Sequence, residues 1–144
     1  YRLVLAEGRA IDYDSPAEEM HELRKSCKKL RYLMEFFRSL YPDELIGTQI
    51  KKLKVLLDNL GDYQDYEVQA DKLISVGEEM KKEGKAATDT VMAMGVLVAG
   101  LLERQEQAHK DFSTCFANFD SAENHPINRS MFKPVKGTKT GGMG

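Results

Sequence analysis

The chain has 144 residues, of which 42% are hydrophobic and 31% charged, an ordinary composition for one folded, helix-rich domain rather than a disordered segment. The formal net charge of −2 argues against a surface that binds nucleic acid over most of its area, so any anion site must be local. No apolar run approaches the roughly 20 residues that cross a bilayer, and the first residues lack the pattern of a signal peptide. We therefore expect a cytoplasmic protein with no membrane contact.

The first predicted element is a helix from about Pro16 to Leu40, after a short N-terminal piece to which we assign no element. Ser15 is the expected cap, Pro16 suits the first turn, and Glu18 and Glu19 lie near the positive end of the helix dipole. Apolar residues then recur in alternating steps of three and four, within an arc of roughly 100°, which predicts a face packed against other helices. This apolar stripe comprises Met20, Leu23, Cys27, Leu30, Met34, Phe37 and Tyr41.

A second side of the same helix carries cations, within a separate arc of about 100°. These are His21, Arg24, Lys28, Arg31 and Arg38, with Lys25 and Lys29 at the edge of the arc. Glu35 is the single acid between Leu23 and Arg38, so few i,i+4 pairs offset the repulsion among these cations. The pattern is compatible with an anion-binding face and equally with cations that pair with acids on neighbouring helices.

The second helix begins near Asp43, because Pro42 disfavours a helical residue before it. Its apolar seam is followed by Gly61, where we expect a kink or a close helix contact, and the Lys81-Lys82-Glu83-Gly84 segment predicts its end. The seam comprises Ile46, Ile50, Leu53, Leu57 and Leu60, and it continues weakly through Val68, Leu73 and Ile74.

Three acids follow one side of this second helix. Asp58, Asp62 and Asp65 are separated by four and three residues, near Lys51 and Lys54. A single helix ridge does not surround a hard metal ion with oxygen ligands. We therefore expect these carboxylates to be solvated or to pair with the basic helix and orient its arginines.

The last predicted helix spans about Ala86 to Phe119. Its expected core positions are Val91, Met94, Val98, Leu101, Gln105, Phe112, Phe116 and Phe119. Strand signals are almost absent and the connections are short, so the predicted fold is all-α, an antiparallel up-and-down helical bundle. We assign residues 1–119 to this bundle and residues 120–144 to a polar, basic tail that is flexible or draped over the surface, with an accessory anion-binding arm as the alternative.

Other candidate chemistry is weak. The paired motifs Glu18-x-x-His21 and Glu106-x-x-His109 are typical of di-iron bundles, but Glu18 and His21 lie well over 100° from the apolar stripe, so they do not face the bundle interior. His109 is expected to be a flanking or hydrogen-bonded histidine. The remaining candidates are two cysteines, Cys27 and Cys115, which we interpret as small buried hydrophobic residues. With no glycine-rich phosphate loop and no paired nucleophile and base, we expect neither an enzyme nor a cofactor.

The segments HELRKSCKKLRYLMEFF and LIGTQIKKLKVLLDNLGDYQD, followed by a long helix that ends in FSTCFANF, resemble the CHAD family, the conserved histidine α-helical domains. The matching motif is a histidine with basic residues at fixed spacing before an aromatic residue, and a second mark is Leu60-Gly61 followed by Asp65. In this chain the histidine motif consists of His21, Arg24, Lys28, Lys29, Arg31 and Tyr32. The resemblance covers about Glu7 to Phe119, and the tail after Asp120 has no counterpart in the family. This chain departs from the family at Leu57, where family members often have glutamine.

This resemblance implies a ligand and a partner. Family members resemble pairs of helical bundles, each of which brings one basic helix to a shared groove that binds inorganic polyphosphate. A chain with one such helix is then half of a two-bundle domain, either within a longer parent protein, which could also carry a phosphohydrolase or kinase domain, or in a homodimer.

We therefore expect a non-enzymatic module that binds inorganic polyphosphate or a similar linear polyanion. The expected contacts are His21, Arg24, Lys28 and Arg31, with Lys25, Lys29, Arg38 and Lys54 as outer contacts. Arginine offers phosphate a planar fork, and lysine a mobile charge. A histidine changes charge near neutral pH, so binding should strengthen as pH falls. The second interpretation is a helical scaffold that meets an acidic protein partner, and the third is a nucleic-acid-binding module.

Overall fold

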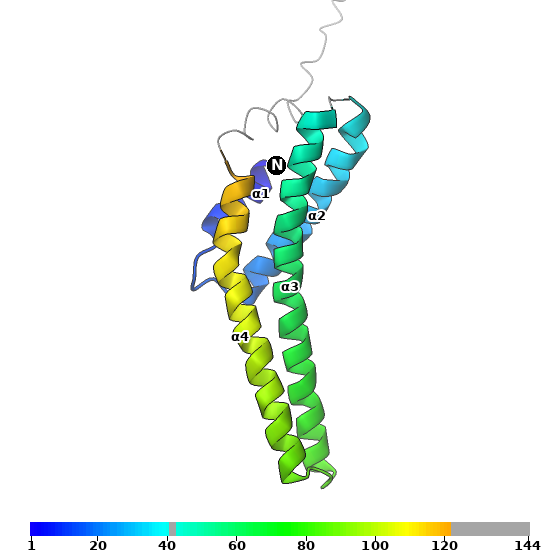
Figure 1. Ribbon diagram of the computed structural model, residues 1–144, viewed down its shortest axis with the longest axis vertical. Coiled ribbons are helices and arrows are strands. Elements are labelled where there is room, and N and C mark those ends of the chain that lie inside the picture. The colour runs from blue at the N-terminus through cyan, green and yellow to red at the C-terminus, as the bar shows by residue number, and fades with distance from the viewer. Residues whose placement is uncertain (41–42, 122–144) are drawn as a thin grey trace, which may run out of the picture.

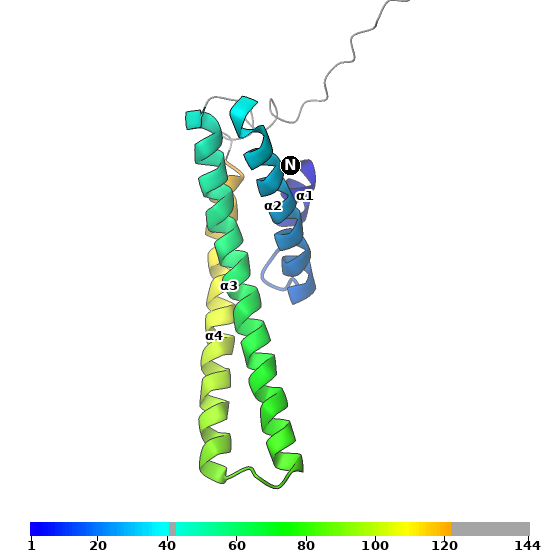
Figure 2. The same ribbon diagram turned by 90° about the vertical axis from the view of Figure 1, so that its right-hand side faces the viewer.

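The structure is a computed structural model that describes residues 1–40 and 43–121. Helices account for nearly all of these residues. The helices in these ranges are α1 (Arg2–Ala10), α2 (Ala17–Phe37), the short 3-10 helix η1 (Arg38–Leu40), α3 (Asp43–Lys82) and α4 (Thr88–Phe119). Consecutive α-helices run antiparallel, and α3 and α4 form a long hairpin whose one end is covered by α1 and α2 (Figures 1 and 2). The predicted all-α, up-and-down bundle is confirmed for these residues.

One core joins the four helices at the end of the hairpin that α1 and α2 cover. In α2 the buried residues are Met20, Leu23, Cys27, Leu30 and Met34, and the predicted seam of α3 from Ile46 to Leu60 is buried as well. Phe112, Phe116 and Phe119 complete this core from α4. Phe37, predicted in the same stripe, is half-buried, and Tyr41 lies outside the described residues. An unbroken three-and-four spacing therefore predicted most of the residues that hold the bundle together.

Helix α1 was missed, because a nine-residue helix is marginal on its own and gains its stability from packing. Val4, Leu5 and Gly8 are buried on one side of it. Gly8 lies so close to α4 that a Cβ atom at this position would be 2.0 Å from the Phe116 ring. Glycine is thus required here for the close approach of α1 to α4.

The predicted cap of α2 was wrong in detail. Pro16, rather than Ser15, is the residue that precedes the first helical turn. The Ser15 hydroxyl instead accepts a hydrogen bond from the Asp12 backbone N–H at 2.9 Å and donates to the Asp12 carboxylate at 3.2 Å. Ser15 therefore stabilises the connection before α2 and does not cap the helix.

The end of α3 follows the predicted pattern. The helix stops at Lys82, and Gly84 adopts a positive φ of 68°, a backbone conformation that favours glycine. At Gly61 the helix continues without interruption, and the expected close contact at this glycine is described below.

The far half of the hairpin departs from the expected core. Val91, predicted as a core residue, is exposed, as are Val68 and Ile74 of the second seam. The other predicted positions Met94, Val98, Leu101 and Gln105 are only partly buried. Periodicity identified the face that α4 turns toward α3, but α1 and α2 do not extend along this part of the hairpin, so only one helix covers each face (Figure 2).

Candidate functional site

The predicted basic residues form a row along α2. His21, Arg24, Lys28 and Arg31 are separated by three, four and three residues, a spacing that keeps them on one face over about 15 Å of helix. A cavity of about 170 Å³ lies beside this row. It is lined by Arg24, Lys28, Arg31 and Tyr32 from α2 and by Leu57 and Asp58 from α3. Three of the four predicted primary contacts therefore share one cavity.

Helix α3 holds the N-terminal half of the row in place. His21 Nε2 lies 2.8 Å from a Glu67 carboxylate oxygen, and Arg24 Nη1 donates to the Gln64 side-chain oxygen at 2.9 Å. A Cβ atom at position 61 would lie 3.7 Å from both Nε and Nη2 of Arg24, so the guanidinium packs against the α3 backbone at the buried Gly61. These contacts fix the orientation of His21 and Arg24 and leave both side chains partly exposed.

The other predicted cations differ in how far they are neutralised. Arg31 donates to Glu35 at 3.1 Å, one turn along α2, and Lys25 pairs with Glu22 at 3.0 Å. The Arg38 guanidinium reaches α3, where it would lie 4.0 Å from a Cβ atom at position 47. The remaining predicted contacts have exposed side chains, namely Lys28, Lys29 and Lys54.

The family model of the CHAD domain matches residues 1–73, which is half of the chain. The chain belongs to the CHAD domain family. No curated protein matches the sequence. The match includes α1, α2 and most of α3, so all eight predicted contact residues lie inside the CHAD match, whereas α4 lies beyond it.

The residues that orient the CHAD basic helix were not those predicted. Asp58, Asp62 and Asp65 are all exposed, as expected for solvated carboxylates, and Asp58 lines the cavity. The cross-helix partners of Arg24 and His21 are instead Gln64 and Glu67. A signal for them exists in the sequence, because Leu57, Leu60, Gln64 and Glu67 continue the three-and-four spacing of the α3 seam. The seam of α3 becomes polar, at Gln64 and Glu67, where α2 presents His21 and Arg24. Polar residues opposite basic residues on the facing helix indicate that the two sets are in contact.

The two Glu-x-x-His motifs do not come together. His21 contacts Glu67, while His109 Nε2 lies 2.8 Å from the Asp12 carbonyl oxygen, which can only accept, so this nitrogen carries the proton. Glu106 accepts a hydrogen bond from Tyr13 at 3.0 Å, and this bond raises the pKa of the Tyr13 phenol. Across residues 1–40 and 43–121, no group of three or more His, Cys, Asp or Glu side chains is arranged to hold a metal ion.

The cysteines are located as predicted for small apolar residues. Cys27 is buried in the core and Cys115 packs partly buried against it. Burial raises the pKa of the Cys27 thiol to about 12, with the charge of Glu7 acting in the same direction. The thiol is therefore protonated at neutral pH, which disfavours nucleophilic chemistry at this position.

A larger cavity lies away from the basic row. It measures about 610 Å³ and is lined by residues of α1, the α1–α2 connection and α4, including Gly8, Tyr13 and Phe116. Its arginine, Arg9, is neutralised by Asp120 through two hydrogen bonds of 2.7 and 2.8 Å. The cavity therefore offers little net positive charge, and an anion is better placed on α2.

The structure also bears on membrane contact. No helix within residues 1–40 and 43–121 combines the length and the apolar character needed to cross a bilayer.

Proposed function

We propose that this CHAD domain binds inorganic polyphosphate along the basic row of α2. The observation that carries the proposal is the cavity where Arg24, Lys28 and Arg31 converge beside Tyr32. Arg24 and Arg31 offer planar forks to phosphate oxygens, and Lys28 adds a mobile charge. Membership of the CHAD family supports this ligand class, because the family resemblance implies polyphosphate.

The shape of the row suits a linear polymer. Its cations extend along a rigid helix instead of surrounding one point, so successive phosphates of one chain can contact His21, Arg24, Lys28 and Arg31 in turn. Lys25, Lys29, Arg38 and Lys54 are proposed as outer contacts. Each exposed contact is weak, but several on one helix add together, and the release of counterions makes the sum strongly dependent on salt.

The role that we propose is binding without catalysis, in the cytoplasm. A second basic helix, from a longer parent chain or from another copy, would face the row across the polymer. Residues 120–144 remain predicted as a polar, basic tail, and from residue 122 this segment lies outside the described residues.

The test compares polyanions of equal charge. Affinities for long-chain polyphosphate, single-stranded and duplex nucleic acid, and orthophosphate are measured at one salt concentration. We expect polyphosphate to bind most tightly, and the double variant Arg24→Glu/Lys28→Glu to abolish binding. Equal affinity for nucleic acid of matched charge, or a double variant that binds as the wild type does, contradicts the proposal.

The second candidate is an acidic protein partner. It is favoured by two exposed aromatic residues beside the row, Tyr32 and Phe36, whose exposed fractions are 68% and 76%. Aromatic and arginine side chains are both enriched in protein interfaces. The variant Phe36→Ala separates the candidates, since Phe36 does not line the cavity: the substitution should weaken a protein contact and leave polyphosphate affinity nearly unchanged.

A further inference from the structure

The first part of α4 is apolar on every side. Residues 91–102, VMAMGVLVAGLL, contain no charged or hydrogen-bonding side chain over three turns of helix. A helix of this kind is normally covered on all sides. Here α3 covers one side, while α1 and α2 lie against the opposite end of the hairpin (Figures 1 and 2).

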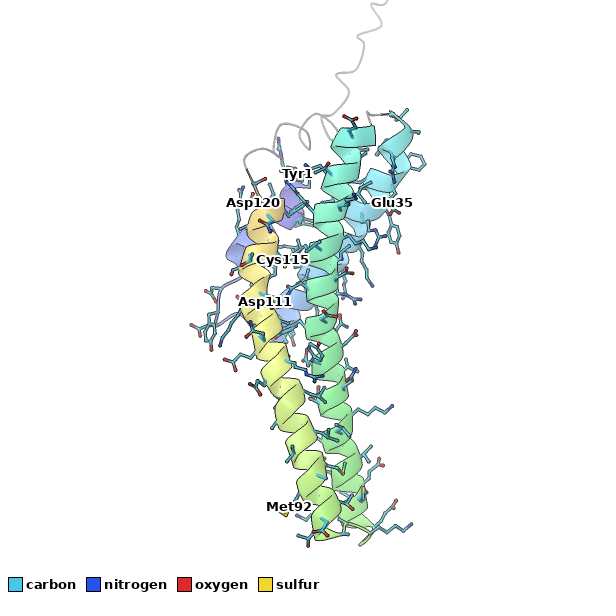
Figure 3. All side chains as sticks on the ribbon, in the orientation of Figure 1. Tyr1, Glu35, Met92, Asp111, Cys115 and Asp120 are labelled. Atoms are coloured by element: carbon cyan, nitrogen blue, oxygen red, sulfur yellow. The ribbon has the colours of Figure 1, made fainter. Side chains whose placement is uncertain are left out.

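The side of α4 that faces away from α3 forms an exposed apolar surface. We define this outer face by Met92, Ala93, Val96 and Gly100, which fall within an arc of about 100°. Met92 and Val96 are 67% and 73% exposed, and Figure 3 shows Met92 directed away from α3. A Cβ atom at position 100 would meet no other atom within 4 Å, so nothing in the described chain packs on this side.

Opposite charges flank the outer face at equal distances. Asp89 lies seven residues before Val96, and Arg104 lies seven residues after Leu97. Both are exposed, and both fall within about 40° of the edges of the same arc. The midpoint between Val96 and Leu97 is therefore a centre about which Asp89 and Arg104 exchange places.

We propose that the outer face of α4 binds a second copy of this chain, with the two α4 helices antiparallel and crossing at this midpoint. In that arrangement each Asp89 meets Arg104 of the other copy, and the pair is formed twice by symmetry. A parallel arrangement would place Asp89 against Asp89. The antiparallel arrangement also sets Ala93 opposite Gly100, so two small residues allow the helices to approach closely.

The charge pattern favours this occupant over a lipid surface. The charged residues that border the face, Asp89, Glu103 and Arg104, are two acids and one cation, a net negative charge that an anionic bilayer would repel. It also lies toward the end of the hairpin remote from the basic row (Figure 1). The proposal is therefore independent of polyphosphate binding.

The first experiment measures the mass of the whole chain by sedimentation equilibrium, without ligand. We expect a reversible dimer that Val96→Glu weakens at least tenfold, and that Gly100→Glu weakens as well, since position 100 has room for a side chain in the single chain. The matched control is Leu40→Glu in η1, which replaces a similarly exposed apolar residue and should leave the dimer unchanged. A chain that stays monomeric up to about 1 mM, the range of very weak association, overturns the proposal.

Charge exchange tests the orientation. Asp89→Arg and Arg104→Asp should each weaken the dimer about three- to tenfold, and the double variant should return its affinity to within about twofold of wild type. Three results would overturn the proposal: a dimer that Asp89→Arg strengthens, a double variant that does not recover, or a monomer whose Val96-dependent binding is to phosphatidylserine-containing vesicles.

Discussion

Replacing Lys28 by glutamine gives the most direct test of the basic row. Lys28 is exposed and lines the same cavity as Arg24 and Arg31. Its removal takes one cation from the proposed site without opening the core. The free energy of unfolding should therefore stay within about 0.5 kcal/mol of wild type, as for most surface substitutions.

The expected loss of affinity follows from one contact. An exposed charge pair contributes up to about 1 kcal/mol, which corresponds to an affinity about fivefold lower at physiological salt. Each phosphate neutralised on a single-stranded polyanion releases about 0.7 of a counterion. The slope of log K against log salt concentration should accordingly become shallower by about 0.7.

The assay is a titration of labelled long-chain polyphosphate, followed by fluorescence anisotropy at several salt concentrations. Lys82→Gln is the matched control, because it removes the same charge at the far end of α3. We expect the control to keep both affinity and slope. An equal loss in the two variants would show that total charge, and not the row on α2, determines binding, and an unchanged slope for Lys28→Gln would remove this residue from the site.

Three further outcomes are expected. Glu67→Gln removes the carboxylate 2.8 Å from His21, so polyphosphate affinity at pH 7 should rise several-fold, whereas a fall would mean that Glu67 serves mainly to hold the histidine. Gly8→Ala forces a methyl group into the Phe116 ring and should lower the free energy of unfolding by about 2 kcal/mol in urea titrations. The pKa of Cys27, about 12 in the folded chain, exceeds its ordinary value, so above about pH 9 the unfolded state loses the proton first. Stability should then fall with rising pH by up to about 1.4 kcal/mol per pH unit, and Cys27→Ala should reduce this slope.

The sequence predicted α2 and α3 well because one spacing rule runs through both helices without interruption. Residues such as Leu23 and Leu53, predicted on the two facing seams, are both fully buried. Where helices pack seam against seam, the buried face is encoded locally, and no knowledge of the partner is needed to find it.

What the sequence did not predict depends on where neighbouring elements end. Val91 and Val98 have the same periodicity as Phe112 and Phe116, yet Val91 is exposed and the phenylalanines are buried. The difference arises because α1 and α2 cover only one end of the hairpin. Periodicity gives the direction of a face, but the length of its cover is a property of the tertiary structure.

The site itself was predicted in part for a similar reason. The charges of Arg24 and Lys28 are visible in the sequence of one helix, whereas their neighbours on α3 require the register between two helices. Gln64 and Glu67 are polar residues on an apolar seam, and such residues resemble a fading periodicity until the opposite helix is placed beside them.

This register divides the proposed site into two parts with different physical roles. His21 and Arg24 are held by α3, so little side-chain entropy remains to be lost when they bind an anion. Lys28 is exposed and lines the cavity one turn further on, and it can follow a flexible polymer at a greater entropic cost. If the row binds polyphosphate, the held residues determine where a phosphate is bound, and the exposed lysines extend the contact along the chain. Gln64 and Glu67 occupy positions of the α2–α3 seam where apolar residues would stabilise the bundle more strongly. In return, Gln64 holds the Arg24 guanidinium at the edge of the cavity.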